Sequence, residues 1–418
     1  MCTQLIHEIP TRLNVTRRDF LRRAVAVASV GGIGGVTLPT VSADDASQAA
    51  DAKPAGDGDV KPSANWPDFR NGSSLRGIAG TSLREKLELK WEREAPDGCQ
   101  ATPAIVDGKV YVAGLNGELQ SLKLADGSPI WTYRSLQTDN PKTFIPGFSS
   151  PVAVTGDSVL CGDEEGTMHC VDLKSGALRW KHETGALVVG GATAIGELVV
   201  YGSHVGKLFG LKRASGELVW EFDTNGPVNG NQAFDGNLTF VSGCMEPVLY
   251  VVDTETGREH TRVQLDELLF GTPALVDGIL YFGTPEGTVL AVDWKAGRTV
   301  WSFASRLSRQ ISSAPAATQD RILIAARDNS LYCIDRQTGK AVWSFETRAD
   351  NDNAPVVVGD RVFFGSGDKH IYAVGLADGV ERWKYNAGVK FVESSPAVGD
   401  EHLVICSSGP AGKVLCFG

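Results

Sequence analysis

An eleven-residue phrase recurs along the chain and constrains its fold more than any other feature. It reads CVDLKSGALRW at residues 170–180, AVDWKAGRTVW at 291–301 and CIDRQTGKAVW at 333–343. Its last position occurs seven times, at Trp131, Trp180, Trp220, Thr261, Trp301, Trp343 and Trp383. Successive positions are 40 to 42 residues apart, except for 49 residues between the first two. A period near 40 residues in a strand-rich sequence predicts the four-stranded blades of a β-propeller.

Each repeat contains four short strand patterns separated by turn residues. In the first repeat, an apolar run at 102–108 precedes a β-branched and aromatic strand at 109–114. The turn Asn116-Gly117 leads to a third strand at 118–124, and a second glycine turn leads to the strand with the tryptophan. Strands joined by such short turns form hairpins. Each repeat is therefore predicted to be an antiparallel four-stranded meander.

Three positions of the phrase have a structural explanation. The seventh residue is glycine in all seven repeats, which suits a turn that needs a positive φ. The final tryptophan is expected on the outermost strand, where its ring covers the gap between adjacent blades. We therefore expect Trp301 to be buried between blades, whereas Trp294 is expected to face solvent. The first residue is small in six of the repeats, as Ser121, Cys170, Gly210, Ala291, Cys333 and Ala373.

This phrase resembles the tryptophan-docking motif Ala-x-Asp-x-x-Thr-Gly-x-x-x-Trp of the PQQ-type β-propeller family. The phrases at 291–301 and 333–343 match it best, and the fourth repeat departs from it with Val251 first and Thr261 last. The resemblance covers about residues 66–418. The family includes the quinoprotein alcohol dehydrogenases and the non-enzymatic outer-membrane assembly factor BamB. The resemblance therefore indicates the fold more strongly than it indicates an activity.

The predicted fold class is all-β, an eight-bladed propeller of four-stranded antiparallel blades at residues 66–418. Seven repeats lie between about 99 and 390, and an eighth begins near Glu393 and stops at Gly418 after its third strand. The segment 87–94 can supply the missing strand, so that an N-terminal strand closes the ring without a free edge. An open solenoid is the alternative, and it leaves Trp91 unexplained. The predicted docking residues are Trp91, Trp131, Trp180, Trp220, Trp301, Trp343 and Trp383.

Residues 1–43 are predicted to be a twin-arginine signal peptide. Residues 16–21, TRRDFL, resemble the twin-arginine export motif, and a mildly apolar run and the small-x-small site Val41-Ser42-Ala43 follow. A basic amphipathic start of a cytoplasmic protein is the alternative. Residues 44–65 are polar and are predicted to be a flexible linker. We therefore expect a periplasmic or secreted protein, and the lack of another run of about 18 apolar residues predicts no transmembrane segment.

The charge of the chain argues against a nucleic-acid partner. The whole chain has 40 basic and 50 acidic residues. Residues 1–43 contain five Arg and two acidic residues, so 35 basic and 48 acidic residues remain, a formal charge of −13. Such a surface repels phosphates. We expect a monomer whose partner is a protein or peptide of the cell envelope.

The cysteines allow two interpretations. Seven remain after residue 43, with no C-x-x-C motif among them. If Glu165-Gly166 forms a two-residue turn, Cys161 lies directly opposite Cys170, and a cross-strand disulfide could form. Alternatively, Cys170 and Cys333 are small core residues, because they occupy the position that Ala291 holds in another repeat.

The family resemblance also implies where a site would be. Its dehydrogenases bind PQQ and calcium in the central channel, and the alcohol-oxidising members carry a vicinal Cys–Cys disulfide and are longer. This chain has no Cys–Cys pair, and its length is closer to that of the BamB type. We therefore expect no catalytic residue, no metal and no cofactor, and a protein-binding scaffold as the function. The alternative is a small alcohol or sugar dehydrogenase that depends on PQQ with calcium.

Polar residues before the first strand of each blade are the candidate ligand contacts, because these positions are expected to line the channel mouth. They could equally well only solvate a water-filled channel. A second candidate is the insertion at 136–147, where Phe144 and Ile145 are expected to be exposed. The acidic run 163–165 could attract calcium, but a solvated hairpin tip explains it as well. The channel-mouth candidates are Gln100, Ser149, Asn229, Asn231, Thr272, Ser312, Asn353, Glu393 and Ser394.

Overall fold

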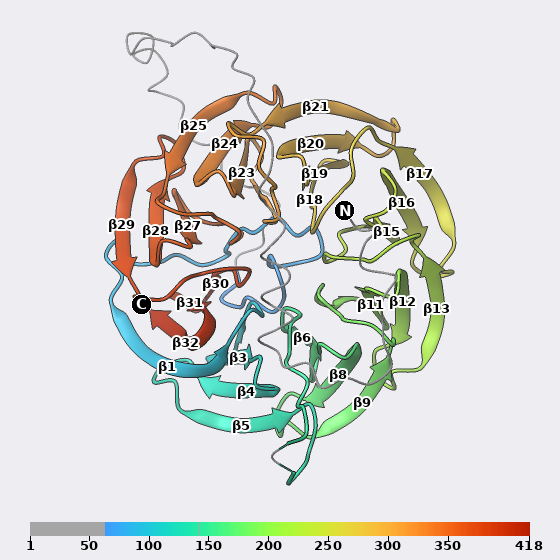
Figure 1. Ribbon diagram of the computed structural model, residues 1–418, viewed down its shortest axis with the longest axis vertical. Helices are drawn as coiled ribbons and strands as arrows, with labels where there is room; N and C mark the ends of the chain where they lie inside the picture. The colour runs from blue at the N-terminus through green and yellow to red at the C-terminus, as the bar shows by residue number, and fades with distance from the viewer. Residues whose placement is uncertain (1–62, 141) are drawn as a thin grey trace. The chain divides into compact units, whose positions relative to one another are not determined.

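The computed structural model describes residues 63–140 and 142–418, and every regular element in these residues is a β-strand. The strands form eight antiparallel sheets of four strands each, arranged as the blades of a ring (Figure 1). The predicted eight-bladed propeller is therefore confirmed. The predicted signal peptide, residues 1–43, and most of the predicted linker lie outside the described residues.

In the first four blades, the strands follow one another in chain order from the innermost to the outermost. Blade one contains β2 (Ala104–Val106), β3 (Lys109–Ala113), β4 (Glu118–Lys123) and β5 (Pro129–Arg134). Blade two contains β6 (Ala153–Thr155), β7 (Ser158–Gly162), β8 (Thr167–Asp172) and β9 (Leu178–Glu183). Blade three contains β10 (Thr193–Ile195), β11 (Leu198–Ser203), β12 (Lys207–Lys212) and β13 (Leu218–Asp223). Blade four contains β14 (Phe234–Asp235), β15 (Leu238–Val241), β16 (Val248–Asp253) and β17 (Glu259–Gln264).

The next three blades repeat this order. Blade five contains β18 (Ala274–Val276), β19 (Ile279–Gly283), β20 (Thr288–Asp293) and β21 (Arg298–Ala304). Blade six contains β22 (Ala316–Ala317), β23 (Arg321–Ala326), β24 (Ser330–Asp335) and β25 (Ala341–Glu346). Blade seven contains β26 (Val356–Val358), β27 (Arg361–Gly365), β28 (His370–Gly375) and β29 (Glu381–Asn386).

Blade eight joins the two ends of the described chain. It contains β30 (Ala397–Gly399), β31 (His402–Cys406), β32 (Ser408–Phe417) and, as its outermost strand, β1 (Leu89–Gly98). β1 pairs antiparallel with β32, and Trp91 lies opposite Cys416 in the register. The predicted closure by an N-terminal strand is therefore confirmed, with a strand that begins and ends a few residues later than the predicted segment 87–94.

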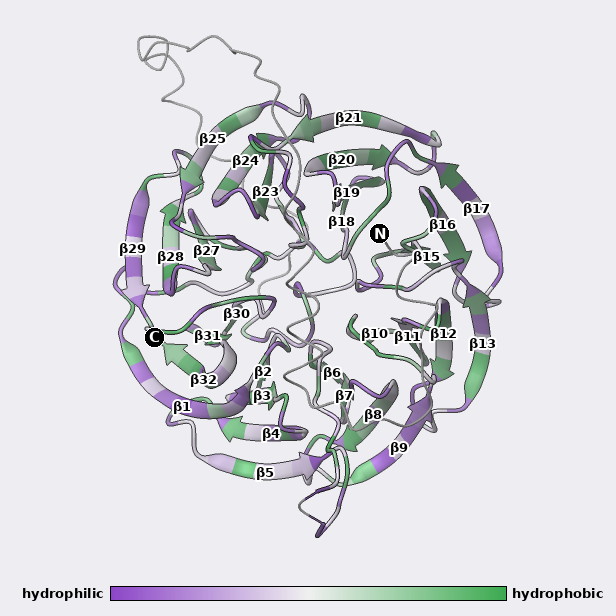
Figure 2. Cartoon of the chain, in the orientation of Figure 1, coloured by the Kyte–Doolittle hydropathy of each residue, from purple (hydrophilic) through white to green (hydrophobic). Residues whose placement is uncertain are grey.

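The hydropathy of the strands follows their place in the blade. The third strands are almost wholly buried, as in β28, whereas four of the six residues of the outermost β29 are exposed. Figure 2 shows the outermost strands β17 and β29 largely hydrophilic and the third strands β16 and β28 largely hydrophobic. Alternation along the outermost strands is expected for a sheet edge with one face in solvent.

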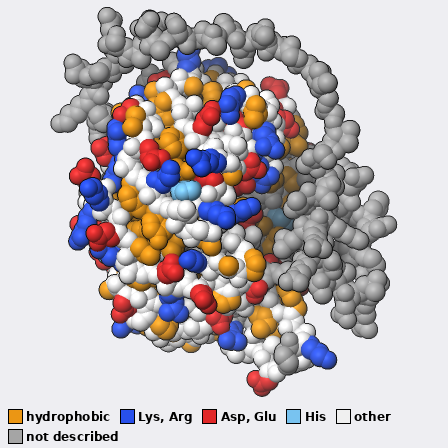
Figure 3. Space-filling view, turned by 60° about the vertical axis from the view of Figure 1, so that its left-hand side comes forward, with side chains coloured by type: hydrophobic (Ala, Val, Ile, Leu, Met, Phe, Trp, Pro, Cys, Tyr) orange, Lys and Arg blue, Asp and Glu red, His pale blue; other side chains and the backbone are white. Residues whose placement is uncertain are grey.

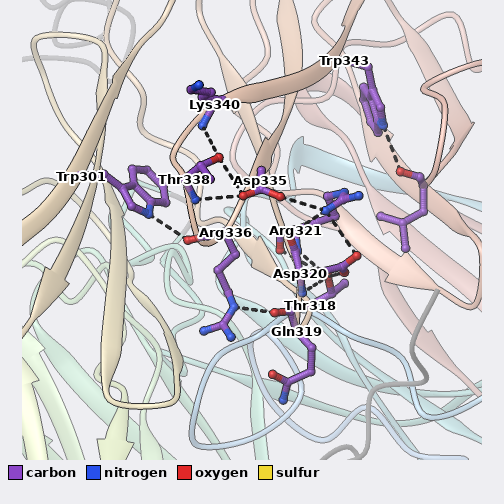
Figure 4. Close-up of polar contacts among 11 residues, drawn as sticks. Trp301, Thr318, Gln319, Asp320, Arg321, Asp335, Arg336, Thr338, Lys340 and Trp343 are labelled. Atoms are coloured by element: carbon purple, nitrogen blue, oxygen red, sulfur yellow. Dashed lines mark hydrogen bonds and ion pairs between the residues drawn. The ribbon is translucent and has the colours of Figure 1, made fainter. Parts of the chain in front are cut away.

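Each docking tryptophan bridges its own blade and the following one. The indole Nε1 of Trp301 donates a hydrogen bond to the carbonyl of Arg336 in blade six, at 2.8 Å (Figure 4). In the phrase at 333–343, to which Arg336 belongs, Asp335 Oδ1 accepts hydrogen bonds from the amide and hydroxyl of Thr338, at 2.9 and 2.8 Å, and so stabilises the turn. Trp91 bonds the carbonyl of Leu124 in the same way, at 2.7 Å. The other bonded pairs are Trp131–Leu173, Trp180–Arg213, Trp220–Thr254, Trp343–Leu376 and Trp383–Leu87.

The register explains two of the constant positions of the phrase. The first residue of the phrase lies directly opposite its own tryptophan, as Gly210 does opposite Trp220. A small residue there leaves room for the ring. The seventh residue lies beneath the tryptophan of the preceding blade: a Cβ on Gly216 would lie 2.6 Å from the ring of Trp180, and its φ is +72°. This position therefore needs glycine both for space and for backbone conformation.

The seam between blades four and five is built differently from the others. Thr261 replaces the tryptophan of blade four, and Gly297 of blade five accordingly has no atom near its missing Cβ. Trp294 of blade five is buried instead, with 7% of its surface exposed, and packs on Phe240 of blade four with ring centroids 5.4 Å apart. The expectation that Trp294 faces solvent is therefore wrong, because it packs back onto the blade that lacks a docking tryptophan. Trp301, in contrast, is only half-buried.

Residues 63–79 form an N-terminal strap along the innermost strands. Trp66 exchanges two backbone hydrogen bonds with Ile105 of β2, at 2.7 and 2.8 Å, and Gly77 accepts a hydrogen bond from Val357 of β26 at 2.9 Å. Between these two points, backbone carbonyls of the strap accept hydrogen bonds from backbone amides of β6, β14, β18 and β22. In Figure 1 the blue segment runs across the middle of the ring. The strap therefore ties six innermost strands together, a role that the sequence patterns did not indicate.

A buried arginine sits within the strap. Arg70 is fully buried, and its Nη2 donates a hydrogen bond to the carbonyl of Pro315 at 2.8 Å. Burial lowers the pKa of Arg70 to about 9. Its guanidinium covers Gly77, where a Cβ would lie 2.0 Å from Nη2. Arg70 thereby fixes the path of the strap against blade six.

The register of blade two decides against the Cys161–Cys170 disulfide that the sequence left open. Cys161 pairs with His169, whereas Cys170 pairs with Leu160, so the register differs by one residue from the one expected and the two thiols lie on opposite faces of the hairpin. The cause is the turn. Asp163 is buried, with 2% of its surface exposed, accepts a hydrogen bond from the amide of Thr167 at 2.7 Å, and lies 2.8 Å from His169 Nε2. All seven cysteines in the described residues are free.

Candidate functional site

The two faces of the ring are built from different loops. On one face, the loops between the second and third strands of a blade bond the loops that lead to the next blade, as in Ser135 N to Gly117 O and Thr184 N to Gly166 O, both at 2.9 Å. We call this side the mouth face, because a cavity lined by the blade-to-blade loops opens at its centre. Phe69 of the strap also lines the cavity, so the strap closes its inner end.

The cavity has a volume of about 250 Å³ and is lined by residues from the strap and all eight blades. Apart from Phe69 of the strap, each of these residues stands in the segment before an innermost strand or, in the case of Arg327, directly after a second strand, and these segments meet at the centre of the ring. Polar residues alternate in the wall with apolar ones such as Phe69 and Phe270, and Gln310, Arg327 and Asp352 join the polar residues expected from the sequence. The expected residues that line it are Gln100, Ser149, Asn229, Asn231, Thr272, Ser312 and Glu393.

Two candidates do not reach the cavity. Asn353 and Ser394 are fully buried. The Nδ2 of Asn353 donates a hydrogen bond to the backbone carbonyl of Ser394, and its Oδ1 accepts one from Gly365 N at 2.9 Å. The hydroxyl of Ser394 donates to the carbonyl of Ala101 at 3.2 Å. Their placement at the channel mouth is therefore corrected: each faces the seam beside the channel, because neighbouring residues of an extended segment point in opposite directions.

Three of the cavity residues also link neighbouring blades. Ser149 Oγ donates to the carbonyl of Val188 at 3.1 Å. Asn231 Oδ1 accepts a hydrogen bond from Gly191 N at 2.9 Å, and Thr272 Oγ1 accepts one from Asn231 N at 2.8 Å. These polar side chains satisfy buried backbone groups at the blade seams. They are less available to a ligand than a side chain without such partners.

The charged part of the wall comes from blades six, seven and eight. Arg327 Nε donates to Asp352 Oδ1 at 2.6 Å, and Ser312 Oγ donates to the same oxygen, also at 2.6 Å. Arg327 Nη1 bonds Gln310 Oε1 at 3.0 Å. Glu393 is exposed to the cavity and has no hydrogen bond to another described residue. It is therefore the carboxylate that can receive a donor from outside.

The surroundings of Glu393 favour its neutral form. Desolvation by the protein around the cavity raises its pKa, the negative charge of Asp352 raises it further, and the positive charge of Arg327 opposes both effects. Since the side chain contacts solvent in the cavity, the energetic effect is small. A cationic or hydrogen-bond-donating group that enters the cavity would meet this carboxylate first.

We expect Glu393→Gln to stabilise the protein at pH 8 by less than about 1 kcal/mol. The folded-state pKa of Glu393 is raised, so the ionised form destabilises the fold above the ordinary pKa of 4.5. At pH 3, well below 4.5, the side chain holds its proton in both the folded and the unfolded chain, and the difference should vanish. Denaturant unfolding at the two pH values measures it. The exposed loop variant Glu286→Gln is the control, and an equal gain in the control would contradict the assignment.

The two carboxylates of the cavity wall differ in their bonding. No group of three or more His, Cys, Asp or Glu residues among residues 63–140 and 142–418 is placed to hold a metal ion. Asp352 is engaged by Arg327 and Ser312, which leaves Glu393 as the carboxylate without a protein donor. The cavity is also slightly below the usual size of about 300–1,000 Å³ for small-molecule pockets. The acidic run 163–165 is not a calcium site either, because Asp163 is buried and bonded to the chain.

Sequence reasoning missed the contribution of the strap and the ion pair. Phe69 lies before the repeats, and Arg327 directly follows the second strand β23, so neither belongs to the segment from which the candidates were taken. The glycine-rich run RNGSSLRGIAG at 70–80 is the sequence signal for an ordered strap. Glycines suit tight turns, and several residues of this run do have a positive φ in the structure. The insertion does expose Phe144, with 54% of its surface accessible, whereas Ile145 is half-buried.

The face of the molecule drawn in Figure 3 shows no field of one sign. Figure 3 shows Lys, Arg, Asp and Glu side chains interspersed over the face in view, with apolar side chains between them. No helix in the described part of the chain is long and apolar enough to cross a membrane. Electrostatics therefore gives no argument for binding to phosphates.

A family model described as outer membrane protein assembly factor BamB matches residues 84–200, 204–313 and 285–416. One curated relative is the outer membrane protein assembly factor BamB of Yersinia pestis, which is 28% identical over 255 residues, 57% of this chain and 62% of the relative. Alignments to the first two such relatives span 51% and 62% of those proteins.

Two solved structures show the same fold. BamB from Moraxella catarrhalis superimposes with a TM-score of 0.65 at 21% identity, over 79% of this chain and 97% of that structure. A europium-containing methanol dehydrogenase superimposes with a TM-score of 0.71 at 12% identity, over 86% and 98% of the two chains. The fold thus occurs in an assembly factor and in an enzyme, and the residues of the site must decide between the two functions.

Proposed function

The chain belongs to the family of the outer membrane protein assembly factor BamB, and from this membership we propose that it is an exported, non-catalytic scaffold that binds a protein partner in the cell envelope. The observation that carries the proposal is the asymmetry of the ring. One end of the channel is closed by the strap, and the other opens on the mouth face. The mouth face is therefore the surface on which a partner would dock.

Exposed apolar side chains support this choice of surface. Five large ones stand on mouth-face loops, and the other seven lie on or beside the outermost strands around the perimeter. Scattered apolar residues are ordinary on a protein surface, so these five support the mouth face only because they stand on the same side of the ring as the cavity. The five are Leu136, Phe144, Val205, Met245 and Leu307.

The export part of the proposal depends on the sequence alone. The twin-arginine segment 16–21 and the site at 41–43 lie outside the described residues. The family name supports a place at the envelope, because an outer membrane protein assembly factor acts there. We therefore propose a periplasmic or secreted location and a monomeric chain.

Site-specific photo-crosslinking in cells tests the docking surface. A photoreactive residue replaces Phe144, Met245 or Leu307 on the mouth face, and Val342 on the perimeter is the control, because Met245 and Val342 are 45% and 44% exposed. We expect one envelope protein to be captured from the mouth-face positions and not from Val342. Fractionation of the same cells shows whether the mature chain reaches the envelope. Equal capture from both surfaces, or capture of no protein from any, would contradict the proposal.

The dehydrogenase is the second candidate, because quinoprotein enzymes share the fold. It is tested by calorimetric titration of the purified protein with PQQ and calcium, followed by dye reduction with a panel of alcohols and aldoses. We expect no saturable binding and no turnover, because, of the two carboxylates that line the cavity, Asp352 is already bonded to Ser312 and Arg327, which leaves Glu393 alone. Saturable PQQ binding together with turnover that Glu393→Gln abolishes would replace the scaffold by the enzyme.

A further inference from the structure

One contact repeats at the seams between blades. A glycine stands at or one residue before the end of the second strand in several blades, and an apolar residue of the next blade packs directly against it. A Cβ on Gly202 would lie 2.3 Å from Val228, and one on Gly283 would lie 2.4 Å from Ile311. The same contact joins Gly162 to Val188 and Gly365 to Phe391.

A backbone hydrogen bond accompanies the contact and identifies the equivalent positions in blade eight. The amide of Ile311 donates to the carbonyl of Thr284, the residue after Gly283, at 3.0 Å. At the closing seam, the amide of Cys99 donates to the carbonyl of Ser407, also at 3.0 Å. Cys99 therefore occupies the apolar position, and Cys406, the residue before Ser407, occupies the glycine position.

The closing seam thus places cysteine against cysteine. Cys99 and Cys406 are both fully buried in one hydrophobic cluster. The equivalence of the seam positions places the two side chains against each other, and the Cys99 thiol is close enough to Cys406 for the two to interact. The thiol of Cys99 also donates to the carbonyl of Ala113, at 3.0 Å. A pair of thiols in contact inside a protein is a potential disulfide.

We propose that Cys99 and Cys406 form a disulfide that covalently closes the propeller ring. In the reaction, the thiolate of one cysteine attacks a low-molecular-weight disulfide such as oxidised glutathione and releases one thiol. The thiolate of the other cysteine then attacks the mixed disulfide and releases the second thiol. The two protein thiols lose two protons and two electrons, and the sulfur–sulfur bond of the oxidant is reduced to two thiols.

The Cys99–Cys406 disulfide would stabilise the closed ring because of where the two residues lie. Blade eight is the blade whose strands come from both ends of the described chain, and β1 is held to β32 by non-covalent pairing. A disulfide between positions 99 and 406 encloses most of the propeller in one covalent loop. Cross-links that close long loops restrict the unfolded chain most. A bond at this seam would therefore oppose opening of the ring.

The neighbouring cysteines are less suited to the reaction. Cys161 donates its thiol hydrogen bond to the carbonyl of Ser150 at 3.3 Å. Cys170, Cys333 and Cys416 each lie opposite a docking tryptophan in three different blades. Cys99 and Cys406 are therefore the pair that we expect to react.

The closed ring protects both thiols. Both are buried, and the contact with Cys406, together with desolvation, raises the pKa of the Cys99 thiol, which disfavours the reactive thiolate. We therefore expect oxidation while the seam is open, during folding or refolding. This timing also determines how the proposal is tested.

The full-length chain is unfolded in denaturant and refolded in a buffer of oxidised and reduced glutathione, and in parallel with a strong reductant. Intact mass and peptide mapping identify the product. We expect a monomer that is lighter by about 2 Da, with one peptide pair linking residues 99 and 406. We also expect its unfolding midpoint to lie above that of the reduced protein. Refolded native protein that keeps both thiols, or that links other cysteines, would overturn the proposal.

Variants separate the bond from the packing. Cys99→Val is the matched change, because valine fills the equivalent position at Val188 and Val228, and Cys406→Ala keeps a small residue in the glycine position. Both variants should fold, form no intramolecular disulfide and lose the difference between the oxidised and reduced midpoints. Cys333→Ala, in blade six, should keep that difference. A variant that keeps the difference without Cys99 or Cys406 would also overturn the proposal.

Discussion

Deletion of residues 66–95 is expected to remove most of the stability of the propeller and to make the protein self-associate. The deletion takes away the strap and most of β1, including the buried residues Trp66, Leu75 and Trp91. Each large apolar side chain contributes about 1.5–3 kcal/mol through burial, and a domain has only about 5–15 kcal/mol in total. β32 would also become a free edge that can pair with another chain.

A shorter deletion separates the two parts of this segment. Removal of residues 66–79 takes away the strap and leaves β1 paired with β32. This variant is expected to be less stable but monomeric, because blade eight keeps its outermost strand. Thermal unfolding and size-exclusion chromatography with light scattering measure both properties. If the longer deletion is as stable and monomeric as the parent, then β1 does not close the ring in solution.

The second large effect is expected for Trp220→Ala, with a loss of about 3–5 kcal/mol in the free energy of unfolding. Trp220 is 7% exposed, donates to the carbonyl of Thr254 at 2.8 Å, and covers Gly257 of the next blade. The substitution leaves a cavity at the seam and an unpaired carbonyl. Denaturant unfolding monitored by circular dichroism measures the loss.

The seam between blades four and five supplies the comparison. Trp294→Ala should cost nearly as much as Trp220→Ala, because Trp294 is equally buried against Phe240. Thr261→Ala, at the position where the other blades carry tryptophan, should cost less than about 1 kcal/mol because it removes few atoms. A small loss for Trp294→Ala would show that this seam does not depend on the reversed packing of the tryptophan.

The blade architecture could be predicted because the same short sequence pattern recurs in every repeat. The period near 40 residues, the turn glycine and the tryptophan each report on short-range geometry, and seven copies make the pattern unambiguous. Trp91 could be assigned to blade eight because the final repeat lacks its own tryptophan strand. The exact register was less predictable. One extra turn residue near Asp163 moved Cys161 away from Cys170, since a shift of one residue changes the face on which a side chain lies.

The candidate site was predicted only in part, for a related reason. Alignment of the repeats identified the segments before the innermost strands, but not the direction of each side chain, so Asn353 and Ser394 face the seam instead of the cavity. The ion pair of Arg327 and Asp352 joins two blades and occurs once in the ring. A contact without a repeat leaves no periodic signal in a single sequence.

The sequence by itself determined the repeat, the number of blades and the strand that closes the ring, because these follow from local patterns that recur. Only the tertiary structure decided what lies at the centre and at the closing seam. The strap crosses the channel, Trp294 packs back onto blade four, and Cys99 meets Cys406. These are contacts between residues far apart in the chain. Such contacts depend on how the blades are placed around the ring, and no local pattern encodes them.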